Sequence, residues 1–136
     1  MSWHDELADL HPCTDAWEWA SRHDTIQAAW DACERGDWML WYLERCGVDR
    51  PRLVLTACAC ARLGLPHVAA GATRPLRAIE TAERWARGDA DVTRAQVSAA
   101  ASAAYAGGDA YDAAAATLRQ CAAIVRAHFP IVEVPR

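Results

Sequence analysis

The stretch WDACERGDWMLWYL, residues 30–43, holds three tryptophans, a cysteine and four charged side chains in fourteen positions. Around its first half, apolar residues recur at intervals of three and four, which is typical of one face of a helix: Ile26, Ala29, Trp30 and Cys33. Asp31 and Glu34 fall on the opposite face. The sequence therefore predicts a helix that carries Trp30 inward and an acidic face outward.

Residues 38–43, WMLWYL, are apolar at six consecutive positions. At 100° per residue they encircle a helix more than once, so they cannot all face one neighbour. One arrangement encloses this helix on every side, which is the more common use of tryptophan. The other leaves an exposed aromatic patch flanked by Asp31, Glu34 and Asp37, which would suit a protein interface. The sequence leaves both open, and both place Trp30 inside.

Helix-start and helix-stop signals recur along the rest of the chain, whereas strand patterns are nearly absent. Capping residues and first-turn prolines predict helix starts at Thr14, at Asp24 with Gln27, at Asp37, at Asp49 with Pro51, at Pro75 and at Thr93 with Gln96. Gly36 and Gly88 are expected to end helices in the left-handed conformation. An alanine-rich segment interrupted by Gly107 and Gly108 predicts two closely packed helices near the C-terminus.

These signals predict an all-α fold, a single compact bundle of six or seven helices with an Ala-rich C-terminal helical hairpin. The 136 residues fit one domain, 1–136, with an N-terminal arm over 1–12 and an extended tail over 130–136. The helix near residues 52–63 is apolar nearly all round and is expected at the centre. The predicted core comprises Trp17, Ile26, Trp30, Leu40, Val54, Ala57, Cys58, Ile79, Leu118, Cys121 and Val125.

Six cysteines, at positions 13, 33, 46, 58, 60 and 121, raise the question of disulfides or a metal. Because the N-terminus lacks a secretion signal, we expect the thiols to stay reduced. The closest pair, Cys58 and Cys60, points about 200° apart on a helix, so the two thiolates cannot bind one ion. We therefore expect small apolar core residues, with no metal site and no cofactor.

The charge balance is acidic, with 18 Asp and Glu against 14 arginines and a formal charge of −4. Proteins that bind nucleic acid usually carry a basic excess, so DNA or RNA binding is disfavoured. No apolar run of about 18 residues free of charge is present, which argues against insertion into a membrane. We expect a cytoplasmic protein.

An enzymatic function would need residues that transfer protons. His23 beside Asp24, or the carboxylates of Asp31, Glu34 and Asp37, are the candidates. Asp24 and Asp37 are already expected as helix caps, and no nucleophile with an adjacent base and no glycine-rich phosphate loop is recognisable. The residues therefore favour a binding protein over an enzyme, with no catalytic residue assigned.

Two blocks of sequence carry a resemblance to a known family: W-D-x-C-x-R-G-D-W-x-L-W from Trp30 and R-A-I-E-x-A-E-x-W-A-R-G from Arg77. Together with PCTDAWEWA, LVLTACACARLGL and LRQCAAIVRAHFP, they cover the chain from about Pro12 to Pro130. The combination resembles immunity proteins of bacterial polymorphic-toxin systems, a family also seen in phage genomes. The resemblance implies an all-helical, non-enzymatic protein that neutralises a toxin by stoichiometric binding; the alternative is a phage or host regulatory adaptor with another protein target.

The predicted partner-binding residues come from three places: the acidic residues around Trp30, the tryptophans of residues 38–43, and the charged helix that begins at Pro75. They are Asp31, Glu34, Asp37, Trp38, Trp41, Arg77 and Glu80. The last two belong to a ladder of charges at three- and four-residue spacings, whose ordinary role is a solvated helix face. A protein partner is expected, and the sequence does not name it.

Overall fold

The computed structural model describes residues 3–67, 71, 73–97 and 115–132. In chain order the elements are α1 (Trp3–Ala8), α2 (Thr14–Ala20), α3 (Ile26–Ala32), α4 (Gly36–Cys46), α5 (Arg50–Arg62), the 3₁₀ helix η1 (Leu65–His67), α6 (Arg74–Ala86) and α8 (Ala115–His128). Every regular element in these ranges is helical, which confirms the predicted all-α class. None of the described helices is both long and apolar enough to cross a membrane.

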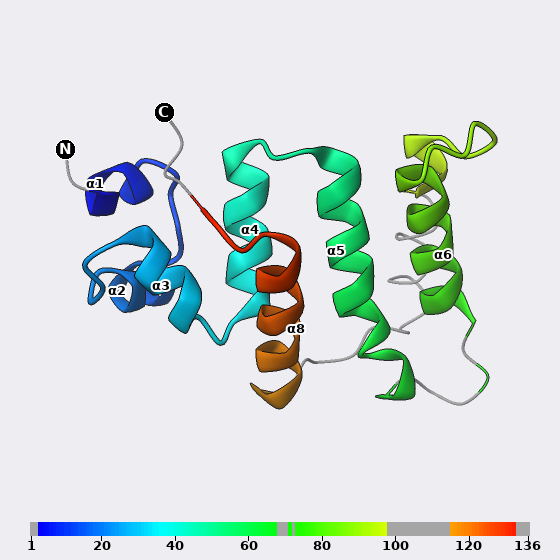
Figure 1. Ribbon diagram of the computed structural model, residues 1–136. Helices are drawn as coiled ribbons and strands as arrows, with labels where there is room; N and C mark the ends of the chain where they lie inside the picture. Colours follow the sequence, from blue (N-terminus) through cyan, green and yellow to red (C-terminus); the bar gives the residue numbers. More distant parts are fainter. Residues whose placement is uncertain (1–2, 68–70, 72, 98–114, 133–136) are drawn as a thin grey trace.

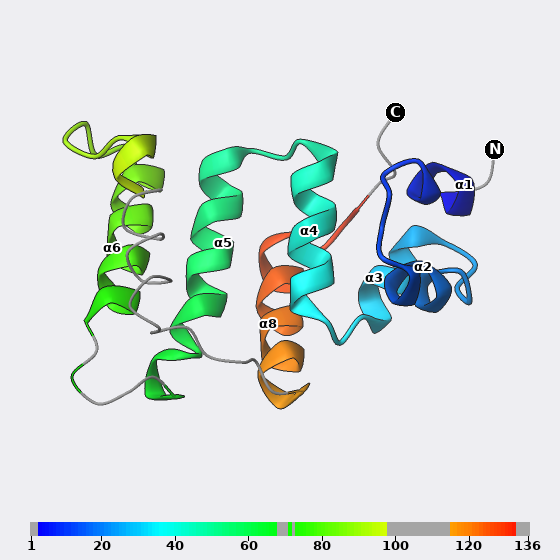
Figure 2. The ribbon, with the colours of Figure 1, turned by 180° about the vertical axis from the view of Figure 1, so that it is seen from behind.

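The centre of the bundle is formed by α4, α5 and α8, which pack against one another (Figure 1). On the far side of α5 lies α6, whereas α1, α2 and α3 gather at the opposite end, beside α4. The view from behind gives the same order of elements (Figure 2). The two ends of the molecule are therefore built from different helices, α1–α3 at one and α6 at the other.

Residues 129–132, which follow α8, are hydrogen-bonded to α3. Trp30 is 4% exposed, and its indole Nε1 donates a hydrogen bond of 2.8 Å to the carbonyl of Phe129. Gln27 Nε2 donates to the carbonyl of Pro130, and its Oε1 accepts from the Val132 amide, both at 2.9 Å. The inward position of Trp30 is thus confirmed. The capping role predicted for Gln27 is wrong, because its side-chain amide is hydrogen-bonded to the backbone of Pro130 and Val132.

Three predicted helix starts are displaced by one or two residues. The N-cap positions belong to Cys13, Thr25 and Arg35, in place of Thr14, Asp24 and Asp37. At α3, the Thr25 hydroxyl accepts from the Ala28 amide at 3.0 Å, because two adjacent residues are good caps and the second one is used. Asp37 instead lies in the first turn of α4, where a negative charge is favourable.

Gly36 does not end a helix as predicted; it begins α4 and is buried. A Cβ atom at this position would lie 2.3 Å from Cys121 Cβ and 2.9 Å from the Ala122 amide nitrogen. Glycine is therefore needed for the close approach of α4 and α8. The left-handed residue at the end of α4 is Gly47, with φ 69°.

Other boundary predictions are confirmed. The Asp49 carboxylate accepts from the Arg52 amide at 3.0 Å, and Gly88 adopts φ 86° after α6. Thr93 and Gln96 form a reciprocal capping box, with bonds of 2.8 and 3.2 Å. The predicted N-terminal arm contains α1, a helix that the sequence reading did not anticipate. Most of the predicted alanine-rich hairpin falls within 98–114, outside the described residues.

The predicted core is largely confirmed. Five of its members are buried, namely Trp30, Cys58, Ile79, Cys121 and Val125. Five more are half-buried, namely Ile26, Leu40, Val54, Ala57 and Leu118. Trp17 is wrong: its side chain is 37% exposed, and Trp19 packs against the core instead. The helix α2 has only seven residues and carries tryptophan at positions 17 and 19. Apolar spacing in so short a helix does not decide which of the two rings faces inward.

An ion pair joins α5 to α6. Arg62 donates to both carboxylate oxygens of Glu83, from Nε to Oε2 at 2.9 Å and from the guanidinium to Oε1. Glu83 is 8% exposed, while the Arg62 side chain remains 43% exposed. Hydrogen bonding from Arg62, against the opposing effect of burial, lowers the pKa of Glu83 below its ordinary value of 4.5. The charged pair therefore stabilises the contact between these helices.

We expect Glu83→Gln to lower the free energy of unfolding by about 1–2 kcal/mol at neutral pH, between the values typical of exposed and buried ion pairs. Because the folded-state pKa is depressed, this contribution is present above pH 4.5 and is lost as pH falls through the lower folded value. Urea denaturation at several pH values measures it. A variant whose stability declines below pH 4.5 as steeply as that of the unmodified protein would contradict this assignment.

The thiols differ in exposure. Cys58 Sγ lies 3.7 Å from the carbonyl of Ile79 on α6, and Cys60 Sγ lies 3.7 Å from that of Cys121 on α8. The pair thus points to opposite sides of α5, as predicted. Burial raises the pKa of Cys58 to about 11 and that of Cys60 to about 12. Both thiols are therefore kept protonated, whereas Cys13 is exposed.

With a thiol-alkylating reagent at mildly alkaline pH, we expect Cys13 to react first in the native protein. The buried thiols of Cys33, Cys58, Cys60 and Cys121 should react only after denaturation, because the thiolate is the reactive form. Peptide mass spectrometry identifies the modified positions. Elemental analysis of the same sample is expected to give no stoichiometric zinc; one zinc per chain, or a disulfide in the purified protein, would refute the prediction of free, metal-free thiols.

Candidate partner-binding groove

The six apolar residues 38–43, which encircle the helix α4, are arranged more like the enclosed alternative than like the exposed one. Met39, Tyr42 and Leu43 are at most 5% exposed. Trp38, Leu40 and Trp41 are half-buried and pack on the edge of the core. None of these six side chains is fully exposed. Most of these six residues therefore belong to the core, and Trp38 and Trp41 are partly accessible at the surface.

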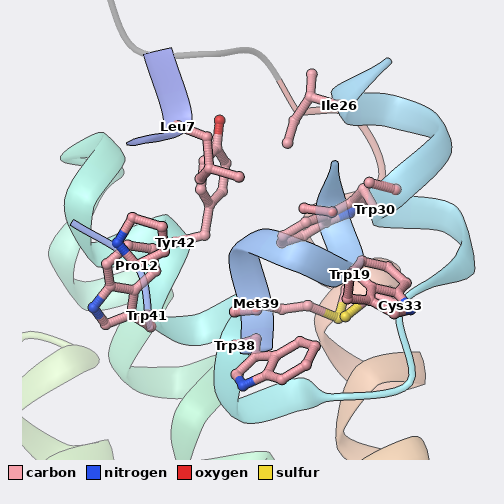
Figure 3. A pocket seen from close by; sticks show the side chains of 13 residues that line it. Leu7, Pro12, Trp19, Ile26, Trp30, Cys33, Trp38, Met39, Trp41 and Tyr42 are labelled. Atoms are coloured by element: carbon pink, nitrogen blue, oxygen red, sulfur yellow. The ribbon is translucent and has the colours of Figure 1, made fainter. Parts of the chain in front are cut away.

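A small apolar cavity of about 70 Å³ lies where α1–α3 meet α4. Four tryptophans line it, at positions 19, 30, 38 and 41, together with smaller apolar residues of the same helices. Figure 3 shows these side chains gathered around the space. Its lining offers almost no polar surface, so it suits an apolar group better than water.

A second and larger hollow, of about 360 Å³, opens between α3, α4 and α8. We call it the groove; its lining residues are Trp19, Ala32, Glu34, Arg35, Trp38, Leu118 and Arg119. Trp19 and Trp38 line both the groove and the apolar cavity, with ring centroids 6.0 Å apart. The two rings therefore form a shared wall, with apolar space on one side and a partly charged groove on the other.

One of the charged residues that line the groove, Arg35, is neutralised by an ion pair with Asp37. Arg35 donates two hydrogen bonds to Asp37, of 2.9 and 2.6 Å, and its guanidinium lies 4.5 Å from the Trp38 ring centroid. Partial burial would raise the pKa of Asp37, but the bonds from Arg35 prevail and lower it. Hydrogen bonding to Asp37 likewise raises the pKa of Arg35. Both groups are consequently charged at neutral pH, and they form an ion pair with each other.

Two other charges of the groove have no such partner. Glu34 and Arg119 are both exposed, and within the described part of the chain neither forms a hydrogen bond or an ion pair. Glu34 lies in the connection between α3 and α4, and Arg119 lies in the first part of α8. The groove thus offers one negative and one positive group to a ligand.

The structure brings together only some of the predicted partner-binding residues. Glu34 and Trp38 line the groove, and Trp41 lines the apolar cavity behind it. Asp31 is exposed and accepts from Gln27 Nε2 at 2.9 Å. Asp37 is paired with Arg35, as described above. The remaining two, Arg77 and Glu80, are exposed on α6 at the other end of the molecule.

The sequence predicts only two of the seven residues that line the groove, Glu34 and Trp38. Trp19 was overlooked in favour of Trp17, and Leu118 was assigned to the core without a surface role. Arg119 was not assigned at all, since nothing in its neighbourhood marks one arginine among 14. The tryptophan pair in WEW was the one usable signal, because two rings two residues apart cannot both be buried on one helix face.

In the described part of the chain, no hydrogen bond joins the side chains of His23 and Asp24, the candidate acid–base pair. The His23 ring nitrogen Nδ1 lies 3.2 Å from the carbonyl of Trp19, and the His23 carbonyl lies 2.9 Å from His4 Nε2. Asp24 uses its backbone carbonyl to accept from Trp3 Nε1. Within the described ranges, no three His, Cys, Asp or Glu residues lie close enough together to hold a metal ion. The groove is suited to recognition through aromatic surface and charge.

A scan against protein-family models gave no match to this chain, and searches of curated proteins and of solved structures gave none either.

Proposed function

We propose that this protein is a non-enzymatic binding module that neutralises a toxin in the cytoplasm by forming a stoichiometric complex with it. The observation that carries the proposal is the groove, in which two half-buried tryptophans lie beside Glu34 and Arg119, neither of which has a hydrogen-bond or ion-pair partner among the described residues. Tryptophan and arginine are the residues that most often dominate binding energy in protein interfaces. The resemblance to immunity proteins supplies the class of partner.

The geometry supports protein recognition in a second way. Protein interfaces combine a central apolar anchor site with a polar rim, and the wall formed by Trp19 and Trp38 provides such a centre. The rim is provided by Glu34 and Arg119. A regulatory adaptor would use the same surface for another protein target, so the identity of the partner distinguishes the two functions.

Co-expression with toxic proteins encoded beside the gene tests the proposal. We expect one of them to lose toxicity and to co-purify with this protein at a fixed ratio. Capture of a non-toxic regulatory protein through the groove would favour the adaptor. If no protein binds and a catalysed reaction responds to Asp31→Ala, the protein is an enzyme and the proposal fails.

Asp31→Arg is expected to weaken partner binding roughly tenfold, because Asp31 is exposed and immediately precedes Ala32, which lines the groove. The side chain is exposed and gives up only the bond from Gln27, so the melting temperature should change by no more than about 3 °C. Titration calorimetry and thermal unfolding measure the two effects. Glu44→Arg, an equal charge change at an exposed position in the last turn of α4, is the matched control; equal affinities for both variants would remove Asp31 from the interface.

A further inference from the structure

The charges of the molecule are divided between its two ends. Residues 1–37, which form α1–α3 and the start of α4, hold nine of the 18 acidic residues and only two of the 14 arginines. All nine except Glu6 are exposed. The rest of the chain carries the other nine acids and twelve arginines. We call residues 1–37 the acidic end; they carry a strong negative charge and supply Trp19, Ala32, Glu34 and Arg35 to the groove.

Within the groove, the positive charges are arranged unevenly. Arg35 is already paired with Asp37 and stacked on Trp38, so it adds little positive potential. The unpaired Glu34 lies on the side of α3, which belongs to the acidic end, and Arg119 lies on the side of α8.

Trp19 provides an aromatic surface for a cationic side chain. Its ring lines the groove and packs against His23 and Trp38, with ring centroids 4.5 and 6.0 Å apart. The neighbouring Trp38 already carries the Arg35 guanidinium at 4.5 Å, which shows that a planar cation fits against one ring of this wall. Arginine and lysine also place an apolar stem along such a surface while their charge reaches a carboxylate.

Resting on the proposed function, we propose that the groove binds a cationic segment of the partner protein, with an arginine or lysine lying over Trp19 and paired with Glu34. The acidic end of the molecule then steers this basic partner toward the groove, an effect that weakens as salt is added. An acidic segment or a nucleic acid would be repelled by the same field.

The test uses a displayed library of random linear peptides, selected on the intact protein. We expect the enriched peptides to carry net positive charge and to bind less tightly as salt is raised. Glu34→Gln should weaken them about fivefold, whereas Arg119→Gln should leave affinity unchanged or increase it. Glu44→Gln, at an exposed position in the last turn of α4 and outside the groove, is the matched control and should have no effect.

Enrichment of neutral or acidic peptides, or the reverse pattern in which Arg119→Gln abolishes binding, would overturn the inference, as would no enrichment at all. A second variant, Ala32→Tyr, separates failure of the cationic-segment proposal from failure of the proposed function. Ala32 is exposed and lines the groove, so the larger side chain fills it whatever the charge of the ligand. If Ala32→Tyr blocks a captured partner but Glu34→Gln does not, the groove is an interface for a segment that is not cationic.

Discussion

Replacing Trp30 by alanine is expected to lower the free energy of unfolding by about 4 kcal/mol, which would consume much of the stability of a domain of this size. The side chain is 4% exposed, and its ring lies 6.2 Å from that of Tyr42 on α4. Truncation leaves a large void and removes the donor for the Phe129 carbonyl. The contact between α3 and the end of α8 is therefore lost together with the packing.

Urea denaturation of Trp30→Ala and of two comparison variants checks this prediction. Trp17→Ala is the matched control, because its ring is 37% exposed and its loss should cost less than about 1 kcal/mol. Trp30→Phe retains most of the apolar volume and should lie between the two. If Trp17→Ala and Trp30→Ala unfold at the same urea concentration, the assignment of Trp30 to the core is incorrect.

Gly36→Ala is expected to cost about 3 kcal/mol, although it adds a single methyl group. The added carbon would lie 2.3 Å from Cys121 Cβ and 2.9 Å from backbone atoms of α8, where no side-chain rotation gives relief. Relief requires α4 and α8 to move apart, which loosens the packing around Val125 and Ala122, two residues with no exposed surface.

Gly47→Ala gives the comparison for Gly36. A Cβ at Gly47 meets nothing within 4 Å, but its φ of 69° is left-handed, which costs an alanine about 1–2 kcal/mol. Chemical denaturation should therefore rank Gly36→Ala as the more damaging change. The opposite ranking would show that α4 and α8 are not in close contact at residue 36.

Local signals in the sequence predicted the parts of the fold that depend on neighbouring residues. The Asp49 cap and the box of Thr93 with Gln96 form from groups three residues apart, so the sequence contains both partners. Gly36 is different, because its role depends on Cys121, far along the chain. A glycine between two helices is usually read as a terminator, and no local feature reveals that another helix lies against it.

The same limit applies to the groove. Glu34 and Trp38 were predicted because one short stretch contains acids and tryptophans. Leu118 and Arg119 reach the groove only because α8 packs on α4, and the sequence does not specify that pairing. Arg77 and Glu80 form an equally good charge pattern on α6, which lies at the other end of the molecule from the groove, so the groove does not test that prediction. Pattern alone does not separate a solvated face from a binding face.

The most direct test of the central claim is a calorimetric titration of the partner protein obtained by co-expression into two tyrosine variants. Ala32→Tyr fills the groove, and Ala61→Tyr places the same side chain at an exposed position near the end of α5. We predict that Ala32→Tyr weakens binding by at least about tenfold while Ala61→Tyr binds as the unmodified protein does. Full affinity of the Ala32→Tyr variant, with its fold intact by circular dichroism, would contradict the assignment of the groove as the binding site.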